Sequence, residues 1–293
     1  MAGAASGGRK ASVLVGLVGS GIGLSRTPAM HEAAGRALYL PYIYRLLDAD
    51  AMPGRPALAD IVNWAERFGF NGINVTYPFK QAILPLLTDL APEAASLGAV
   101  NTVLFHGGKR VGHNTDYWGF RRSFTEAVPD AASVGVLLIG AGGAGVAVAQ
   151  ALIDLGVRKL IINDADAARA AALAERLNSP SCPVESVKTI DGATLAAVDG
   201  VVNATPVGMA KSPGTPIDTD LLQRRHFVAD IVYFPLETAL LRAARARNCL
   251  TVSGEGMAIQ QAVKAFELFS GMTPDSAQMR ETFRNFDRQS PAA

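Results

Sequence analysis

The stretch that decides the fold, residues 134–164, reads VGVLLIGAGGAGVAVAQALIDLGVRKLIIND. Its apolar opening, 134–139, predicts a buried strand. A glycine-rich turn follows, and then an alanine-rich segment that predicts a helix over 144–155. A second strand is expected over 159–163, with Asp164 directly after it. The stretch is therefore one strand–turn–helix–strand unit of an α/β sheet.

The glycine-rich turn carries residues suited to binding a dinucleotide. Gly140, Gly142 and Gly145 permit, in turn, a tight turn, close approach of the backbone to a pyrophosphate, and close packing of helix on strand. The amide groups at the helix N-terminus favour an anion, and Asp164 can accept hydrogen bonds from the adenosine ribose. Gly-x-Gly-x-x-Gly alone also occurs in ordinary glycine loops. With the strand, helix, second strand and acid in place, it predicts a site for a nicotinamide or flavin dinucleotide.

Length, charge and cysteine content exclude several classes of protein. With 293 residues the chain is long for one hydrophobic core, so two domains are expected. The 27 basic and 26 acidic residues nearly cancel, which argues against a nucleic-acid-binding surface. The cysteines and histidines form no metal-ligand spacing, so no metal is expected, and the cysteine usage fits a reducing compartment. No apolar run is long enough to predict a membrane span, and residues 1–11 are expected to be a disordered tail.

Apolar strand patterns alternate with helix patterns along both remaining parts of the chain, which predicts two α/β domains. Before the glycine turn we expect strands at 12–19 and 42–47, helices at 28–38 and 56–68, a strand ending near Thr76, a helix starting at Pro78, a hairpin of 99–105 and 110–113 around Gly107-Gly108, and a connecting helix at 118–127. After Asp164 we expect helices at 167–177, 257–270 and 275–286 and strands at 201–204, 227–232 and 250–252.

Two groups of polar residues in the first part lie where a ligand can bind. Ser25 and Thr27 stand at the predicted helix start, with Thr27 suited to the N-cap and Pro28 to the first helical position. Two hydroxyl groups there suit a carboxylate, although a plain helix cap explains them equally well. Thr76 and Lys80 follow a strand at the carboxyl edge of the sheet, where open α/β sheets bind ligands. A lone lysine at such a place is more often a solvated helix residue than a catalytic one.

Seven motifs follow one another in order over nearly the whole chain. They are Ser25-Arg26-Thr27-Pro28, Asn74-Val75-Thr76-Tyr77-Pro78-Phe79-Lys80, Gly98-Ala99-Val100-Asn101-Thr102, Asn114-Thr115-Asp116, Gly140-Ala141-Gly142-Gly143-Ala144, Asn203-Ala204-Thr205-Pro206-Val207-Gly208-Met209, and Gly256-Met257 through Gln261-Ala262. Any one of them can arise by chance, but seven in register are specific. Together they resemble the shikimate dehydrogenase family.

The resemblance implies an α/β fold of two domains that face each other across an active-site cleft. The substrate-binding domain would be 12–118, completed by C-terminal helices of 256–287 that pack back on it. A Rossmann-type NAD-binding domain would be 131–255. The implied reaction is reversible hydride transfer between the nicotinamide and the secondary alcohol carbon of a cyclohexane or cyclohexene carboxylic acid.

The same resemblance implies a role for each matched residue. Lys80 and Asp116 would form the catalytic pair, in which a carboxylate orients a lysine that moves a proton. The substrate would be held by Ser25 and Thr27 at its carboxylate, by Thr76, Asn101, Asp116 and Gln261 at its hydroxyl groups, and by Tyr233. The cofactor-binding residues would be Gly140, Ala141, Gly142, Gly143, Ala144, Gly145, Asp164, Arg169, Thr205, Pro206, Val232 and Gly254.

One departure from the family pattern concerns the choice of cofactor. Members that use NADP place an arginine after the asparagine that ends the second strand, whereas here Asn163 is followed by Asp164, with Asp166 close by. At about 4 Å and an effective dielectric constant near 20, repulsion between unit charges approaches about 4 kcal/mol. Even partly screened, this favours NAD by about a hundredfold. Arg169 is the one residue that can offset the acids, but its position suits packing near the adenine equally well.

A second departure concerns the carboxylate pocket. Biosynthetic members usually read His-Ser-x-Ser-Pro where this chain has Leu24-Ser25-Arg26-Thr27-Pro28. Threonine here, together with the acid at 164, resembles the quinate/shikimate dehydrogenase branch, which oxidises quinate and shikimate to their 3-dehydro forms in catabolism. We therefore expect a cytoplasmic, NAD-dependent enzyme that acts on small molecules as a monomer or homodimer, with no nucleic-acid or membrane partner. The alternatives are an NADP-dependent shikimate dehydrogenase of aromatic amino acid biosynthesis, a non-catalytic sensor, and an enzyme for an aminated ring substrate.

Overall fold

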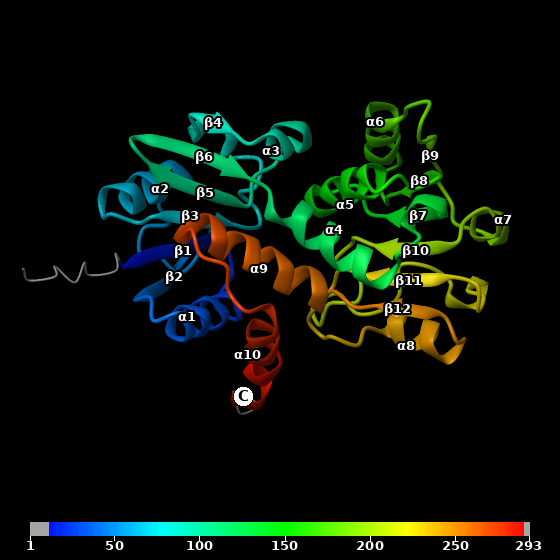
Figure 1. The fold of residues 1–293 in the computed structure, drawn as a ribbon. Coiled ribbons are helices and arrows are strands. Elements are labelled where there is room, and N and C mark those ends of the chain that lie inside the picture. The colour runs from blue at the N-terminus through cyan, green and yellow to red at the C-terminus, as the bar shows by residue number, and fades with distance from the viewer. Residues whose placement is uncertain (1–11, 290–293) are drawn as a thin grey trace, which may run out of the picture. The chain divides into compact units, whose positions relative to one another are not determined.

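The computed structural model describes residues 12–289, which form two compact units (Figure 1). The first unit contains the described residues up to Ala91, Val100–His113, and the chain from Ala265 onward. The second contains Pro92–Ala99 and Asn114–Lys264. Relative to the expected domains, the 92–99, 114–118 and 256–264 segments fall in the second unit. The expected tail, 1–11, lies outside the described residues.

The first unit is built on a six-stranded mixed sheet. Strands β1, β2 and β3 are parallel, and β5 and β6 form an antiparallel hairpin beside β3. The hairpin turns at Gly107 and Gly108, whose φ values of 57° and 75° favour glycine, as the sequence predicted. In spatial order the strands are β2 (Tyr42–Asp48), β1 (Val13–Gly19), β3 (Gly72–Val75), β5 (Thr102–His106), β6 (Lys109–His113) and β4 (Asp89–Leu90).

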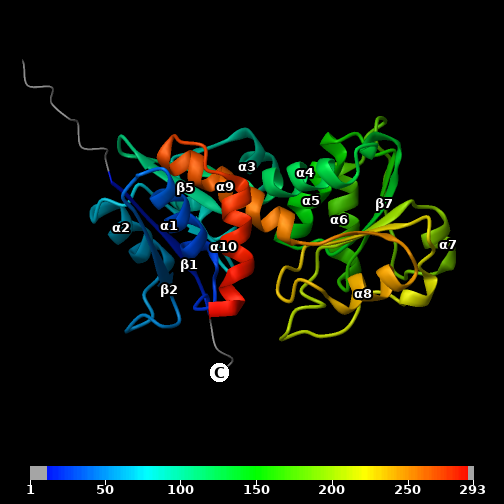
Figure 2. The same ribbon diagram turned by 60° about the horizontal axis from the view of Figure 1, so that its bottom comes forward.

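Helices α1 (Thr27–Ala37), α2 (Leu58–Arg67) and α10 (Ser276–Gln289) also belong to the first unit. Helix α10 packs against α1, as Figure 2 shows, so the C-terminal end of the chain returns to this unit as expected. The Arg26 guanidinium, which donates to the Phe283 carbonyl at 3.2 Å and lies over the Phe283 ring, joins α10 to the start of α1.

Two helix starts in the first unit differ from prediction. The N-cap of α1 is Arg26, not Thr27, and its side chain makes no capping hydrogen bond. No helix begins at Pro78. Residues 77–83 form turns, and a short 3₁₀ helix, η1 (Leu84–Leu86), follows. Pro85 prevents an α-helix from continuing through this segment, because proline in a helix interior removes a hydrogen bond and clashes with the preceding turn.

The second unit is built on a six-stranded parallel sheet. The four inner strands are short and largely buried, as expected for strands that helices cover on both faces. The strand order changes direction between β7 and β10. Along the chain, β8 and β9 are added on one side of β7, and β10, β11 and β12 are then added on its other side. In spatial order the strands are β12 (Leu250–Val252), β11 (Phe227–Asp230), β10 (Gly200–Asn203), β7 (Gly135–Ile139), β8 (Lys159–Asn163) and β9 (Val184–Ser186).

Alternating residues of β7 build two cores in this unit. Val136 and Leu138 pack on one face, and Leu137 and Ile139 on the other, all at most 3% exposed. The first face is covered by α4 (Thr115–Ala127), α5 (Gly143–Asp154) and α6 (Ala167–Leu177), and the second by α7 (Gly192–Ala196) and α8 (Ala239–Ala246) (Figure 1).

The remaining helices are α3 (Pro92–Leu97) in the second unit and α9 (Glu255–Ser270), which runs from the second unit into the first. Helix α4 begins at Thr115, three residues before its predicted start, because the Asn114 side chain caps it by accepting from the Tyr117 amide. Across 12–289, none of the helices combines the length and apolar character that a bilayer crossing needs.

Candidate active site

The glycine turn between β7 and α5 leaves the N-terminus of α5 open. Gly140 has a φ of 105°, and a Cβ at Gly145 would lie 2.0 Å from the Gly140 carbonyl oxygen. At Gly142 and Gly143, by contrast, a Cβ would meet no atom within 4 Å. Gly142 is the N-cap of α5 and offers no side-chain hydrogen bond. The backbone amides of this twelve-residue helix therefore face open space that suits a pyrophosphate.

Asp164 follows β8 and is fixed by backbone amides. Its Oδ2 accepts from the Ala141 N–H at 2.7 Å, and its Oδ1 accepts from the Asp166 N–H at 2.8 Å. The side chain is only 10% exposed, so its charge is poorly screened by solvent. Arg169 lies near both acids, with nitrogen–oxygen distances of 3.7 Å to Asp164 and 3.6 Å to Asp166. Arg169 therefore pairs with both carboxylates, and its role toward the cofactor stays a prediction.

A buried polar network holds the loop after β10. Asn203 donates to the Val207 carbonyl at 2.9 Å and to Asp230 Oδ1 at 3.0 Å, while its Oδ1 accepts from the Thr205 hydroxyl at 2.7 Å. The other oxygen of Asp230 accepts from the Thr238 hydroxyl at 2.7 Å. Burial raises the pKa of Asp230 despite these hydrogen bonds. The sequence identified Asn203 and Thr205 but missed Asp230 and Thr238; a carboxylate that ends a buried apolar strand was the available signal.

The other expected cofactor residues lie at the same edge of the second sheet. A Cβ at Gly140 would lie 3.0 Å from the Thr205 methyl group, so the ends of β7 and β10 are in contact. A Cβ at Gly254 would lie 2.4 Å from the Ile231 carbonyl oxygen, which places Gly254 against the backbone beside Val232. These residues gather at the carboxyl edge where the strand order reverses, the usual ligand site of an open α/β sheet.

The first unit brings four predicted substrate residues and the predicted catalytic Lys80 to one edge of its own sheet. Ser25 and Thr27 follow β1, and the Ser25 hydroxyl accepts from the Thr27 amide at 3.4 Å. Thr76 follows β3, and its amide bonds to the Val18 carbonyl of β1 at 2.9 Å. The Lys80 carbonyl accepts from the Val100 amide at 2.8 Å, directly before Asn101.

The loop that carries Ser25 is anchored by an acid of β2. Asp48 accepts from the amides of Gly21 and Ile22, each at 3.0 Å. The Ser25 amide in turn bonds to the Ile22 carbonyl at 2.9 Å. The hydroxyl groups at the start of α1 are therefore presented by a constrained loop.

The second unit holds the remaining predicted substrate residues. Asp116 lies in the first turn of α4 and is 5% exposed. Gly119, one turn further along, lets α9 approach closely, since a Cβ there would lie 3.0 Å from the Gln261 Cβ. Asp116 and Gln261 thus flank the contact between α4 and α9. Tyr233 is 44% exposed in the loop after β11. Lys80 belongs to the first unit and Asp116 to the second, so their pairing stays a prediction.

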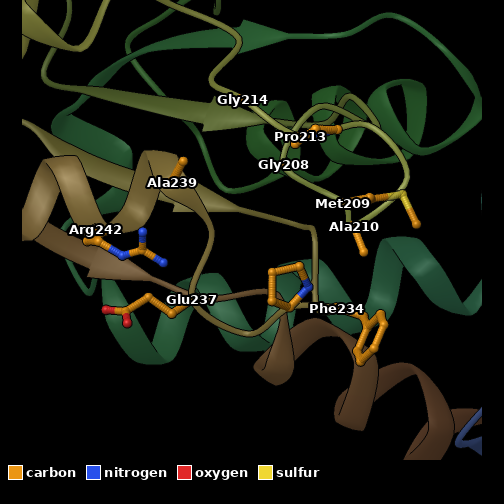
Figure 3. Close-up of a pocket in the computed structure, with 10 residues that line it drawn as sticks. Gly208, Met209, Ala210, Pro213, Gly214, Phe234, Glu237, Ala239 and Arg242 are labelled. Atoms are coloured by element: carbon orange, nitrogen blue, oxygen red, sulfur yellow. The ribbon is translucent and has the colours of Figure 1, made fainter. Parts of the chain in front are cut away.

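A separate cavity of about 260 Å³ opens in the second unit (Figure 3). Phe234 stands on one side and Met209 on another, while Glu237 comes from the segment before α8 and Arg242 from α8 itself. No predicted site residue lines it. Its lining is Gly208, Met209, Ala210, Pro213, Gly214, Phe234, Pro235, Glu237, Ala239 and Arg242.

Residues 12–289 contain no group of three or more histidine, cysteine, aspartate or glutamate side chains placed to hold a metal ion. The parallel sheet, the open glycine turn and the acid at the end of β8 define a dinucleotide-binding protein of the Rossmann class.

Comparison with known proteins identifies the family: the chain belongs to the shikimate dehydrogenase family, as its seven motifs predicted. The family model described as shikimate dehydrogenase substrate binding domain matches residues 17–103. The model for shikimate / quinate 5-dehydrogenase matches 124–210, and the model for the shikimate 5'-dehydrogenase C-terminal domain matches 254–282.

Individual relatives match over almost their full length. Quinate/shikimate dehydrogenase (NAD(+)) of Corynebacterium efficiens is 50% identical, with 93% of this chain and 98% of that protein covered. Shikimate dehydrogenase (NADP(+)) of Streptomyces avermitilis is 49% identical, with 92% and 94% covered. The solved structure of quinate dehydrogenase from Corynebacterium glutamicum in complex with NAD has a TM-score of 0.88 at 48% identity, covering 94% of this chain and 99% of that one. The predicted two-domain α/β fold is confirmed by these matches.

Proposed function

We propose that this protein is an NAD-dependent quinate/shikimate dehydrogenase, which reversibly oxidises a ring alcohol to the 3-dehydro acid. The observation that carries this proposal is the Asp164 carboxylate, fixed by backbone amides directly after Asn163. Relatives named for NAD and for NADP are about equally identical to the chain, at 50% and 49%, so overall identity does not separate the two cofactors. The Asp164 charge at the end of β8 distinguishes NAD from NADP, because it repels the additional phosphate of NADP.

The glycine turn and its surroundings fit NAD. The amides at the start of α5 hold the pyrophosphate, and Asp164 accepts from the ribose hydroxyl groups. An ionised carboxylate has about four lone-pair sites, of which the Ala141 and Asp166 amides use two. When bound, NAD supplies the acceptor for the hydride. The residues proposed to hold it are Gly140, Ala141, Gly142, Gly143, Ala144, Gly145, Asp164, Arg169, Thr205, Pro206, Val232 and Gly254.

The first unit supplies most of the substrate site. Ser25 and Thr27 bind the ring carboxylate, while Thr76, Asn101, Asp116 and Gln261 hold the ring hydroxyl groups and Tyr233 adds a further contact. As functional domains we propose 12–118 with 256–287 for the substrate and 131–255 for NAD. The gathering of four of these residues at one edge of the first sheet supports this assignment.

Lys80 and Asp116 act as the catalytic pair. In oxidation the pair takes up the hydroxyl proton of the substrate, and in reduction it returns that proton to the forming alcohol. Lys80 also stabilises the negative charge that develops on the reacting oxygen. Because these effects act on the chemical step, their loss lowers turnover more than substrate affinity.

Replacement of Lys80 tests the mechanism. Lys80→Ala is expected to lower kcat by roughly 10²–10⁴-fold with a smaller change in KM for quinate or shikimate. Lys109→Ala is the matched control, since Lys109 belongs to the same unit, is 66% exposed and pairs with Asp89 at 3.2 Å. Wild-type turnover in Lys80→Ala would remove Lys80 from the mechanism. Turnover with NADP alone would instead favour the biosynthetic alternative.

A further inference from the structure

A chain of buried hydrogen bonds in the first unit leads from β2 to Asn101. Tyr44 donates its hydroxyl proton to Asn74 Oδ1 at 2.8 Å, and Asn74 Nδ2 donates to Thr102 Oγ1 at 2.9 Å. Thr102 then donates to Asn101 Oδ1 at 3.1 Å. All four side chains are at most 8% exposed. We call this set of Tyr44, Asn74, Thr102 and Asn101 the amide relay.

A backbone carbonyl fixes the direction of the amide relay. Asn74 Nδ2 also lies 3.3 Å from the Asn101 carbonyl oxygen, which can only accept. The nitrogen of the Asn74 amide must therefore point toward β5, and its oxygen toward Tyr44. Burial keeps the Tyr44 hydroxyl protonated by raising its pKa well above the usual value, and Tyr42 adds to this effect.

The direction of the relay decides what Asn101 offers to a ligand. Thr102 has a single hydroxyl proton, and the relay assigns it to Asn101 Oδ1. The Asn101 amide is thereby oriented with its oxygen toward Thr102. Its Nδ2 group, which is a donor only, lies on the opposite side of the amide.

We propose that Tyr44, Asn74 and Thr102 are positioning residues that orient the Asn101 amide, so that Asn101 donates to a lone pair of a ring hydroxyl of the substrate. This inference rests on the proposed substrate role of Asn101. It also gives the site a chemical preference: a neutral hydroxyl oxygen has lone pairs that accept from Nδ2, whereas an ammonium group at the same ring position has none. The aminated ring substrate is thereby disfavoured at the hydroxyl that Asn101 contacts.

The test removes the hydrogen bond that Thr102 donates to Asn101. Thr102→Val keeps the shape and removes the donor, and we expect KM for quinate or shikimate to rise roughly 5- to 10-fold, the effect of one hydrogen bond. The value of kcat should stay within about threefold, and KM for NAD should not change. Thr102→Ser restores the hydroxyl and is expected to return KM to near the wild-type value.

A neighbouring tyrosine provides the matched control for Tyr44. Tyr42 lies two residues away on β2 and is also buried, but its hydroxyl lies 2.9 Å from His31 Nδ1 and takes no part in the relay. Tyr44→Phe and Tyr42→Phe each remove one buried hydroxyl group, so both are expected to lower the melting temperature. Only Tyr44→Phe is expected to raise KM for the ring substrate. An equal rise in both variants would mean that loss of packing, not loss of the relay, causes the effect.

A double-mutant cycle separates failure of the relay from failure of the proposed site. If the relay acts through Asn101, then Thr102→Val should change KM by less than about twofold in the Asn101→Ala background. A full 5- to 10-fold rise in that background overturns the relay. Unchanged KM and kcat in Asn101→Ala alone would instead remove Asn101 from the proposed substrate site. A rise in KM in Asn101→Ala without one in Thr102→Val would leave that site intact and refute the relay.

Discussion

Removing the charge of Asp164 is expected to relax the preference for NAD. A unit charge brought to about 4 Å of this carboxylate would meet a repulsion of about 4 kcal/mol at an effective dielectric constant near 20. The Asp164 side chain is 10% exposed, so solvent screens little of this repulsion. Arg169, at 3.7 Å but 55% exposed, offsets about 1 kcal/mol at most. The remaining 3 kcal/mol or so corresponds to roughly 160-fold in cofactor discrimination.

The assay is the ratio of kcat/KM for NAD to that for NADP at saturating quinate or shikimate. Asp164→Asn should lower this ratio by the stated factor. Its neighbour supplies the control: Asp166→Asn removes the same charge from a side chain that is 52% exposed, and asparagine keeps the N-cap of α6. We expect a change below about threefold for Asp166→Asn. An unchanged ratio in Asp164→Asn, or equal effects in the two variants, would refute the electrostatic reasoning.

Three further changes test the framework of the second unit. Gly145→Ala should abolish folding of the unit or NAD binding, since the new Cβ would lie 2.0 Å from the Gly140 carbonyl oxygen. Gly143→Ala is the control: its new Cβ would meet no atom within 4 Å, so this variant should melt near the wild-type temperature. Arg169→Ala should raise the ratio of kcat/KM for NAD to that for NADP, because it leaves Asp164 and Asp166 without their positive partner. A lower ratio would contradict this. Burial raises the pKa of Asp230, so its stabilising contribution is complete below its ordinary pKa and declines as the pH rises through the raised value. Asp230→Asn should remove that decline. Urea titrations should therefore show the variant gaining stability relative to the wild type as the pH rises above about 4, and a constant difference would exclude this titration.

The sequence predicted elements whose local signals agree with their tertiary setting. The β7–α5–β8 unit was found because a buried apolar run, a glycine turn and an alanine-rich helix follow one another without conflict. Helix α6 was predicted at its observed bounds because Asp166 provides a cap before a regular apolar pattern.

Short elements were missed, because few residues give a weak periodic signal. Strand β9 has three residues and β4 has two, and each depends on a neighbouring strand for its existence. Helix α8 has eight residues and depends on the Thr238 cap, which accepts from the Leu241 amide at 3.3 Å, and on packing into the second core.

The residues of the candidate site were also predicted only in part. Motif residues such as Asp164 and Asn101 were identified because the chemistry requires a given residue type at a given place along the chain. Tyr44 and Asp230, which hold two other motif residues, were missed because they are distant in sequence from their partners. Tyr44 is 30 residues from Asn74, and Asp230 is 27 from Asn203. Only the register of the strands brings such pairs together.

The most direct test of the central claim is the initial rate of the unaltered protein with quinate or shikimate and each cofactor, followed by the absorbance of the reduced nicotinamide near about 340 nm. The account predicts reduction of NAD, with kcat/KM at least about tenfold above that for NADP. A preference for NADP, or no reduction of either cofactor with either ring acid, would contradict it.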